Sequence, residues 1–98
     1  MEIDKKDVEI LKAITKHFGK EFAICKTIEG DKFLIEGDLS KVEVPTNLKC
    51  KYVIHSHTLN PHPSEADLKA SEKIPVCLIY NNIVRCFFNR KELKPILK

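Results

Sequence analysis

Three side chains of the kinds that ligate metal ions lie close together in the middle of the chain. His55 and His57 flank a serine, so in a strand they project to the same side, where two imidazoles can share one ion. Asp67 follows after a short segment and offers an anionic oxygen. Two histidines and one carboxylate leave a tetrahedral zinc with its fourth position open to water, as in catalytic rather than structural sites. These residues therefore predict a Zn²⁺ site that activates water.

The elements around these residues predict how the three side chains meet. Residues 51–55 read as a buried strand, and Pro61 and Pro63 enforce a loop after it. Ser64 then begins a helix as its N-cap, with Asp67 three residues further on. A strand, a tight loop and a helix start in direct succession fold the chain back, which brings Asp67 near the imidazoles.

Each fragment also has a plainer interpretation. Histidines on a half-exposed strand are common, and a serine followed three residues later by an acid is how many helices start. On that interpretation Asp67 cannot point fully at both its helix start and a metal. His62, inside the loop, is either an alternative third ligand or an exposed residue. Two histidines and a carboxylate also suit ferrous iron, so a non-haem iron centre is a further interpretation.

A family resemblance follows from the order of these residues. His55-Ser56-His57 followed by residues 63–67, Pro-Ser-Glu-Ala-Asp, resembles the signature of the JAMM metalloproteases, the zinc isopeptidases of the Jab/MPN domain family. The resemblance implies that His55, His57 and Asp67 hold Zn²⁺ and that Ser64 supports the oxyanion. It covers most of the chain, because residues 76–91 are similar to the strands that close archaeal members.

The resemblance also implies a general base and a function. Glu21 stands just after the first helix, where the family places the glutamate that activates water, and Glu29 and Glu36 are the alternatives. The implied function is a zinc-dependent metallopeptidase or isopeptidase that acts on a peptide or on the tail of a ubiquitin-like protein. Two departures favour instead an inactive metal-binding or protein-interaction module. Thr58 stands where the family usually has proline, and the loop up to Asp67 is one residue shorter than the family pattern.

The first half of the chain predicts one helix and a hairpin. Apolar residues recur at three- and four-residue steps over residues 3–18, with Asp4 and Gly19 as caps, so this segment reads as a helix with one buried stripe from Val8 to Phe18. Residues 21–28 and 32–36 read as strands joined by a turn, and residues 41–44 as a further strand.

The second half predicts another hairpin. Residues 76–88 read as two strands joined at Asn81-Asn82, in a register that places Cys77 opposite Cys86, either as two buried thiols or as a disulfide. Residues 91–98 fit a last strand or a short helix. The fold class is therefore α/β (α+β), a single domain over residues 1–98 with a mixed sheet flanked by two helices, which the resemblance specifies as JAMM/MPN-like, with cytidine-deaminase-like architecture.

Composition narrows the classes of partner. The chain has 98 residues, 43% apolar and 32% charged, which is ordinary for a globular domain. A net charge of +3, with both signs spread along the chain, does not predict nucleic-acid binding. No apolar run approaches membrane-spanning length, and the charged N-terminus lacks a secretory signal, so we expect a cytoplasmic protein with reduced thiols. The four cysteines lack the Cys-x-x-Cys spacing of a thiolate zinc site.

Overall fold

The first helix begins and ends at its predicted caps. In the computed structural model, which describes all 98 residues, α1 spans Lys5–Phe18. The Asp4 carboxylate accepts a hydrogen bond from the Lys6 backbone N–H, and Gly19 ends the helix in the left-handed conformation that favours glycine. Ile3, the first apolar residue of the predicted pattern, lies before this cap and belongs instead to a short strand.

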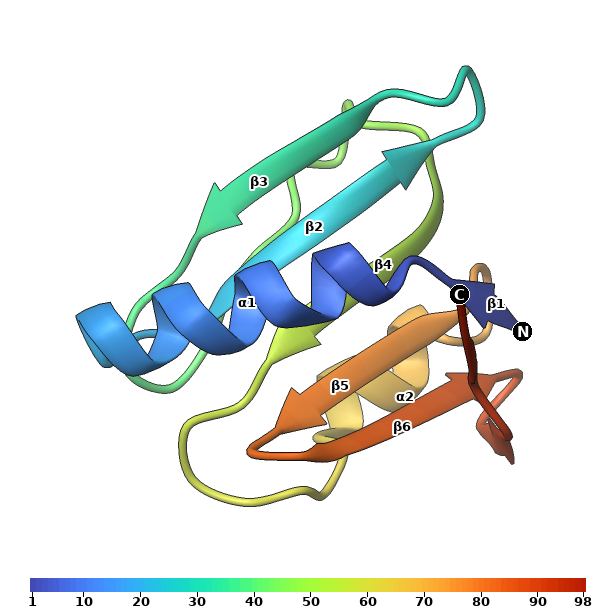
Figure 1. Ribbon diagram of the computed structural model, residues 1–98. Coiled ribbons are helices and arrows are strands. Elements are labelled where there is room, and N and C mark those ends of the chain that lie inside the picture. The colour runs from blue at the N-terminus through green and yellow to red at the C-terminus, as the bar shows by residue number, and fades with distance from the viewer.

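Six strands form the main sheet, in the spatial order β3-β2-β4-β5-β6-β7 (Figure 1). β4 and β5 are parallel, and the other neighbours are antiparallel. The parallel pair needs a crossover, which contains the second helix. The bounds of these elements are β2 Phe22–Thr27, β3 Lys32–Glu36, β4 Cys50–Ser56, α2 Glu65–Ala70, β5 Val76–Tyr80, β6 Ile83–Phe88 and β7 Lys91–Leu93.

The two ends of the chain form a separate pair of strands. β1 (Glu2–Ile3) runs parallel to β8 (Ile96–Leu97), so the two termini lie side by side (Figure 1). The last residues, left open between strand and helix by the sequence, are therefore the two short strands β7 and β8.

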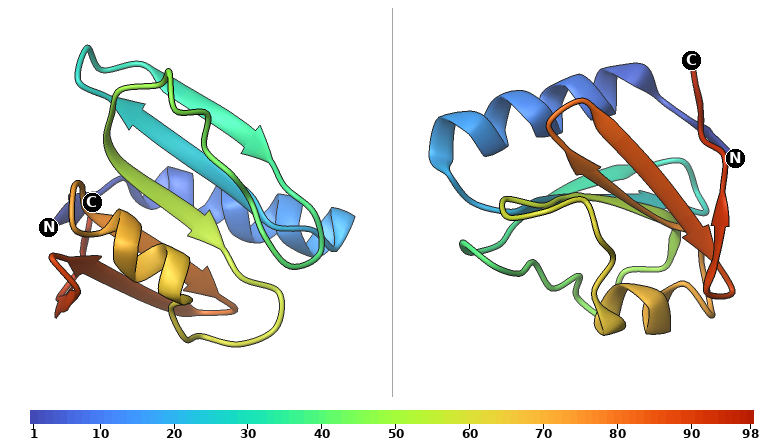
Figure 2. Two further views of the ribbon diagram at one scale, coloured as in Figure 1. Left: turned by 180° about the vertical axis from the view of Figure 1, so that it is seen from behind. Right: turned by 90° about the horizontal axis from the view of Figure 1, so that it is seen from below.

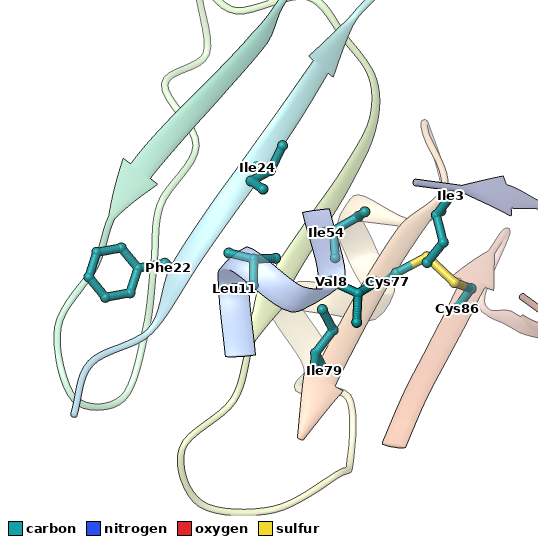
Figure 3. Packing of buried hydrophobic residues seen from close by; sticks show 9 residues of the cluster. All are labelled: Ile3, Val8, Leu11, Phe22, Ile24, Ile54, Cys77, Ile79 and Cys86. Atoms are coloured by element: carbon teal, nitrogen blue, oxygen red, sulfur yellow. A yellow bond between two sulfur atoms is a disulfide. The ribbon is translucent and has the colours of Figure 1, made fainter. Parts of the chain in front are cut away.

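The two helices lie on opposite faces of the sheet (Figure 2). The α1 face holds the main apolar core, in which Leu11 and Ile54 are completely buried. Phe18, predicted to belong to the buried stripe of the helix, is instead 58% exposed and contacts only the edge of the core through Phe22. Figure 3 shows the core cluster, which consists of Ile3, Val8, Leu11, Phe22, Ile24, Ile54, Cys77, Ile79 and Cys86.

The hairpins form as predicted, but the cysteines differ from the expected thiols. Cys77 lies opposite Cys86 in the β5–β6 register, and the two form a disulfide. A second disulfide, which the sequence did not predict, joins Cys25 to Cys50. No cysteine is free, so the expectation of reduced thiols is wrong.

Residues 41–44 do not form the expected strand. They belong to a loop, residues 37–49, in which the Asp38 carboxylate accepts hydrogen bonds from the backbone N–H groups of Ser40 and Lys41. These bonds make a local turn that ends at Lys41, and Pro45 has no N–H to give to a strand ladder, so both ends of the segment disfavour strand pairing. Neither helix of the fold has the length and apolar character needed to cross a membrane.

Candidate metal centre

The end of β4 directs the two histidines to the α2 face. Side chains alternate along the strand, so Ser56 enters the α1 face while His55 and His57 share the other. β4 ends at Ser56, but the His57 backbone N–H still donates to the Ile79 carbonyl, 2.8 Å away, and so keeps His57 in register. His55 is 5% exposed and His57 is partly buried, which gives the pair a sheltered but reachable position.

The three predicted ligands converge on one point. The Nε2 atoms of His55 and His57 lie 2.9 Å apart. Asp67 places Oδ1 3.1 Å from the first of these nitrogens and Oδ2 3.1 Å from the second. Ligand atoms bound tetrahedrally to zinc at about 2.0–2.1 Å lie about 3.3 Å from one another. The triangle of two nitrogens and a carboxylate oxygen therefore fits a zinc ion after a small expansion.

A hydrogen bond outside the triangle orients His57. Its Nδ1 lies 3.1 Å from the carbonyl oxygen of Asn60, which accepts the ring proton. The bond at Nδ1 orients the ring so that Nε2 faces Asp67, and metal-ligating histidines in proteins are usually oriented by such a bond from their other ring nitrogen. Residue types alone could not predict this contact, because the acceptor is a backbone carbonyl.

Asp67 caps its helix and reaches both imidazoles. The Ser64 backbone N–H donates to Asp67 Oδ2 over 3.0 Å, and the Asp67 N–H donates to Ser64 Oγ over 3.1 Å, which together make a capping box. The predicted conflict between the two roles is therefore wrong, because a carboxylate has enough lone pairs for both. Burial raises the pKa of Asp67, but hydrogen bonds from His55 and His57 outweigh it and hold the pKa well below its usual range. The short loop thus places an ionised carboxylate beside the two imidazoles.

Glu21 lies at the edge of the same site. It immediately precedes β2, and its N–H and C=O bond to Asp38 and Gly37 at the end of the β2–β3 hairpin. Its side chain is 6% exposed and faces the metal-site hollow, a cavity of about 390 Å³ that is also lined by His55, His57, Ser64 and Asp67. Burial raises the pKa of Glu21, the nearby charges of His57 and His55 offset that rise only in part, and no protein group donates a hydrogen bond to its carboxylate. A carboxylate without a protein partner suits a role in binding and deprotonating water.

The alternative glutamates do not reach the metal-site hollow. Glu29 is exposed in the turn between β2 and β3. Glu36 forms an ion pair with Lys20, with 2.5 Å between Oε2 and Nζ. Glu21 is therefore the only one of the three candidate bases that lines the hollow.

Ser64 can donate a hydrogen bond into the metal-site hollow, whereas His62 is not placed to be a ligand. Ser64 Oγ accepts the capping bond from Asp67, which leaves its own O–H free to donate into the metal-site hollow. His62 also borders the hollow, but it is exposed and does not belong to the group of side chains that can share an ion. The predicted alternative of His62 as third ligand is therefore wrong.

Two contacts that the sequence did not predict hold the loop after β4. Thr58, which replaces the expected proline, donates from Oγ1 to the Leu39 carbonyl over 2.6 Å. Arg85 donates from Nη1 to the Pro61 carbonyl over 2.9 Å while its other nitrogens bind Glu92. The loop is thus bonded both to residues 37–49 and to β6.

An apolar groove shares two residues with the candidate metal centre. It has a volume of about 480 Å³ and lies between the loop of residues 42–49 and the segment from α2 to Ile74. His55 and Asp67 are among the residues that line it. Its walls are mainly apolar and include Val42, Val44, Leu48, Ala70, Ile74 and Val76, with Lys73 beside them.

Comparison with known proteins places the fold. No protein-family model and no curated protein matches the chain. A solved structure, a Jab1/MPN domain protein from Archaeoglobus fulgidus, superposes with a TM-score of 0.59 and 22% sequence identity. The match covers 99% of this chain and 98% of that chain. The chain therefore has the Jab1/MPN fold, a mixed sheet with two helices, and carries a group of three metal-ligating side chains on it.

Proposed function

We propose that this protein is a zinc-dependent metallopeptidase or isopeptidase of the JAMM type. The observation that carries the proposal is the convergence of His55, His57 and Asp67, whose ligand atoms lie about as far apart as those around a tetrahedral zinc. The Jab1/MPN fold supports it, because this fold is the one that the resemblance in the sequence implies. A histidine pair and a carboxylate also leave room for water beside the metal.

Each residue of the proposed site has a separate role in hydrolysis. A Zn²⁺ ion held by the three ligands supplies a Lewis acid and an acidified water, whose pKa in such sites is about 7. Glu21 accepts the proton of the attacking water and returns it to the departing amine. Ser64 donates its free O–H to the carbonyl oxygen of the scissile bond as negative charge develops there.

The substrate that we propose is an extended chain, either a peptide or the tail of a ubiquitin-like protein. The apolar groove supports this choice, because His55 and Asp67 line it and its apolar walls can take apolar side chains next to the scissile bond. The metal-site hollow opens beside it and leaves space for the polar leaving group.

The experiment that tests the proposal separates metal binding from catalysis. Glu21→Gln removes the base and keeps the shape, so we expect it to retain zinc while cleavage of a fused or conjugated ubiquitin-like protein falls by about 10²–10⁴-fold. Glu29→Gln, at an exposed turn position, is the matched control and should retain both properties. Cleavage by Glu21→Gln at the unsubstituted rate would contradict the assignment.

Two other outcomes point to other functions. Full zinc loading without hydrolysis of any such substrate would favour an interaction module, which Thr58 in place of the expected proline supports. Iron rather than zinc after anaerobic purification would favour a non-haem iron centre.

A further inference from the structure

β3 is an unpaired edge of the sheet. It is first in the spatial strand order, and β2 is its only neighbour in the sheet (Figure 1). The α1 helix packs on β2, β4 and β5, and it bonds to β3 at one end through Asp7 and Lys32. Leu34, at the centre of β3, is 55% exposed, and Phe33 is also exposed. Exposed apolar edges of this kind are sites at which another strand adds.

The free backbone groups of β3 follow from its register with β2. The Thr27 N–H donates to the Asp31 carbonyl, and the Gly37 N–H donates to the Glu21 carbonyl. Thr27–Asp31 and Glu21–Gly37 are therefore hydrogen-bonded pairs of the antiparallel ladder. Every second residue of an antiparallel strand bonds to its neighbour, so between these two pairs it is Phe33 and Ile35 that bond to β2. Lys32, Leu34 and Glu36 consequently direct their N–H and C=O groups away from the sheet.

The sequence of β3 is complementary to itself. It reads Lys-Phe-Leu-Ile-Glu, with Leu34 at the centre. Antiparallel pairing of two copies about Leu34 places Lys32 of each opposite Glu36 of the other, and these are the residues with free backbone groups. Leu34 then faces its own counterpart, and opposite charges meet at both ends, which is the favourable arrangement for directly opposed residues.

We propose that β3 pairs antiparallel with β3 of a second copy of this chain, about a two-fold axis at Leu34, and joins the two six-stranded sheets into one. Such an interface is isologous and closes after two copies. His55 lies on β4, two strands inside the edge, so the proposed contact leaves the metal centres open.

Ion pairs within each copy extend the complementarity. Lys32 Nζ lies 2.9 Å from Asp4 Oδ2 and 3.0 Å from Asp7 Oδ1. Glu36 pairs with Lys20 in the same way. In the proposed dimer, Lys32 of one copy therefore lies between its own Asp4 and Asp7 and the Glu36 of the second copy, which in turn pairs with its own Lys20. Negative and positive side chains alternate along this row. This alternation favours a second copy over an arbitrary extended chain.

The test is sedimentation of the whole chain as its concentration is raised. We expect a monomer–dimer equilibrium, in which Leu34→Lys raises the dissociation constant by about tenfold or more because it opposes two lysines on the axis and removes an apolar contact. Leu34→Glu should do the same. An equal mixture of the two variants should recover dimers, because Lys then faces Glu. Ile83→Lys, at an exposed strand position on β6, is the matched control and should dimerise normally.

Hydrogen exchange gives an independent readout. Exchange at the Leu34 amide should slow as protein concentration rises, whereas the Phe33 amide, bonded within the hairpin, should not change. A protein that stays monomeric at millimolar concentration would overturn the proposal. A dimer that Leu34→Lys leaves intact would also overturn it. A protein that is monomeric before substitution, and in which Leu34→Lys abolishes binding of the proposed substrate tail, would show that β3 binds substrate instead of a second copy.

Discussion

His55 and Ser56 are neighbours in β4, but their side chains serve opposite faces of the sheet. Ser56 is buried on the α1 face, where its Oγ accepts hydrogen bonds from Thr15 Oγ1 at 2.6 Å and from the Phe22 N–H at 2.9 Å. His55 instead turns its Nε2 toward another imidazole and a carboxylate. Around Ser56 the polar groups satisfy each other, whereas around His55 they form a set of candidate metal ligands.

The covering of the two faces explains this difference. A helix of 14 residues seals the α1 face over a continuous apolar core. A helix of only 6 residues and an irregular loop cover the α2 face, and the apolar groove and the metal-site hollow lie beside them. We infer that the α1 face supplies most of the stability, while the α2 face carries the candidate metal centre.

The largest expected effect tests the contribution of the α1 face to stability. Leu11→Ala should lower the free energy of unfolding by about 3–5 kcal/mol, because Leu11 is completely buried and the cavity cannot close. Leu48→Ala makes the same change in the wall of the apolar groove, where the side chain is only partly buried, and should cost less. Denaturant unfolding of both variants measures the difference, and equal losses would contradict the comparison.

The two disulfides allow a second comparison, because Cys77–Cys86 lies in the α1-face core while Cys50 lines the apolar groove. Loop-closure entropy predicts about 3.5 kcal/mol for Cys25–Cys50, with a separation of 25 residues, and about 2.6 kcal/mol for Cys77–Cys86, with a separation of 9.

Variants that keep one disulfide each provide the measurement. In Cys77→Ala/Cys86→Ala, the difference in unfolding free energy between oxidised and reduced protein belongs to Cys25–Cys50 alone. The reciprocal variant isolates the other disulfide. A larger value for Cys77–Cys86 would show that its place in the core matters more than the length of the loop it closes.

A smaller loss of stability is expected from Ser56→Ala. This change leaves the Phe22 N–H buried without its acceptor, so unfolding should become easier by about 1–3 kcal/mol. Zinc affinity should stay unchanged, because Ser56 lies on the face opposite the ligands. Loss of zinc in a folded Ser56→Ala protein would show that the two faces are coupled.

The smallest loss of stability is expected from Ser64→Ala, which removes the α2 cap and should cost about 1 kcal/mol. Its effect on cleavage should exceed its effect on stability, because the free O–H of Ser64 is assigned to the oxyanion. Cleavage rates and unfolding curves of the same preparation provide the comparison. Unchanged cleavage would limit Ser64 to its capping role.

Much of the framework was predictable because its signals are local. The caps at Asp4 and Gly19, the hairpin at Asn81 and the capping box at Ser64 each depend on residues a few positions apart. The shared side of His55 and His57 follows from strand alternation alone. The convergence of the three predicted ligands was predictable because it too depends on residues that are close together in the sequence.

The rest depends on contacts between distant segments. Cys25 lies opposite Val53, while Cys50 lies opposite Thr27 beyond an irregularity in the β2–β4 register, so no simple strand pairing predicts their disulfide. Phe18 has the spacing of a core residue but is left exposed at the end of its helix. The bond of Thr58 to the Leu39 carbonyl also joins segments that only the fold brings together.

The most direct test of the account is zinc binding by the purified chain, measured together with the nature of the ligand atoms. We predict one zinc per chain, bound by nitrogen and oxygen without sulfur in X-ray absorption, because all four cysteines form disulfides. His57→Ala should lose this zinc, and His62→Ala should keep it. A chain that binds no zinc, or that binds it equally well after His57→Ala, would contradict the assignment of the metal centre.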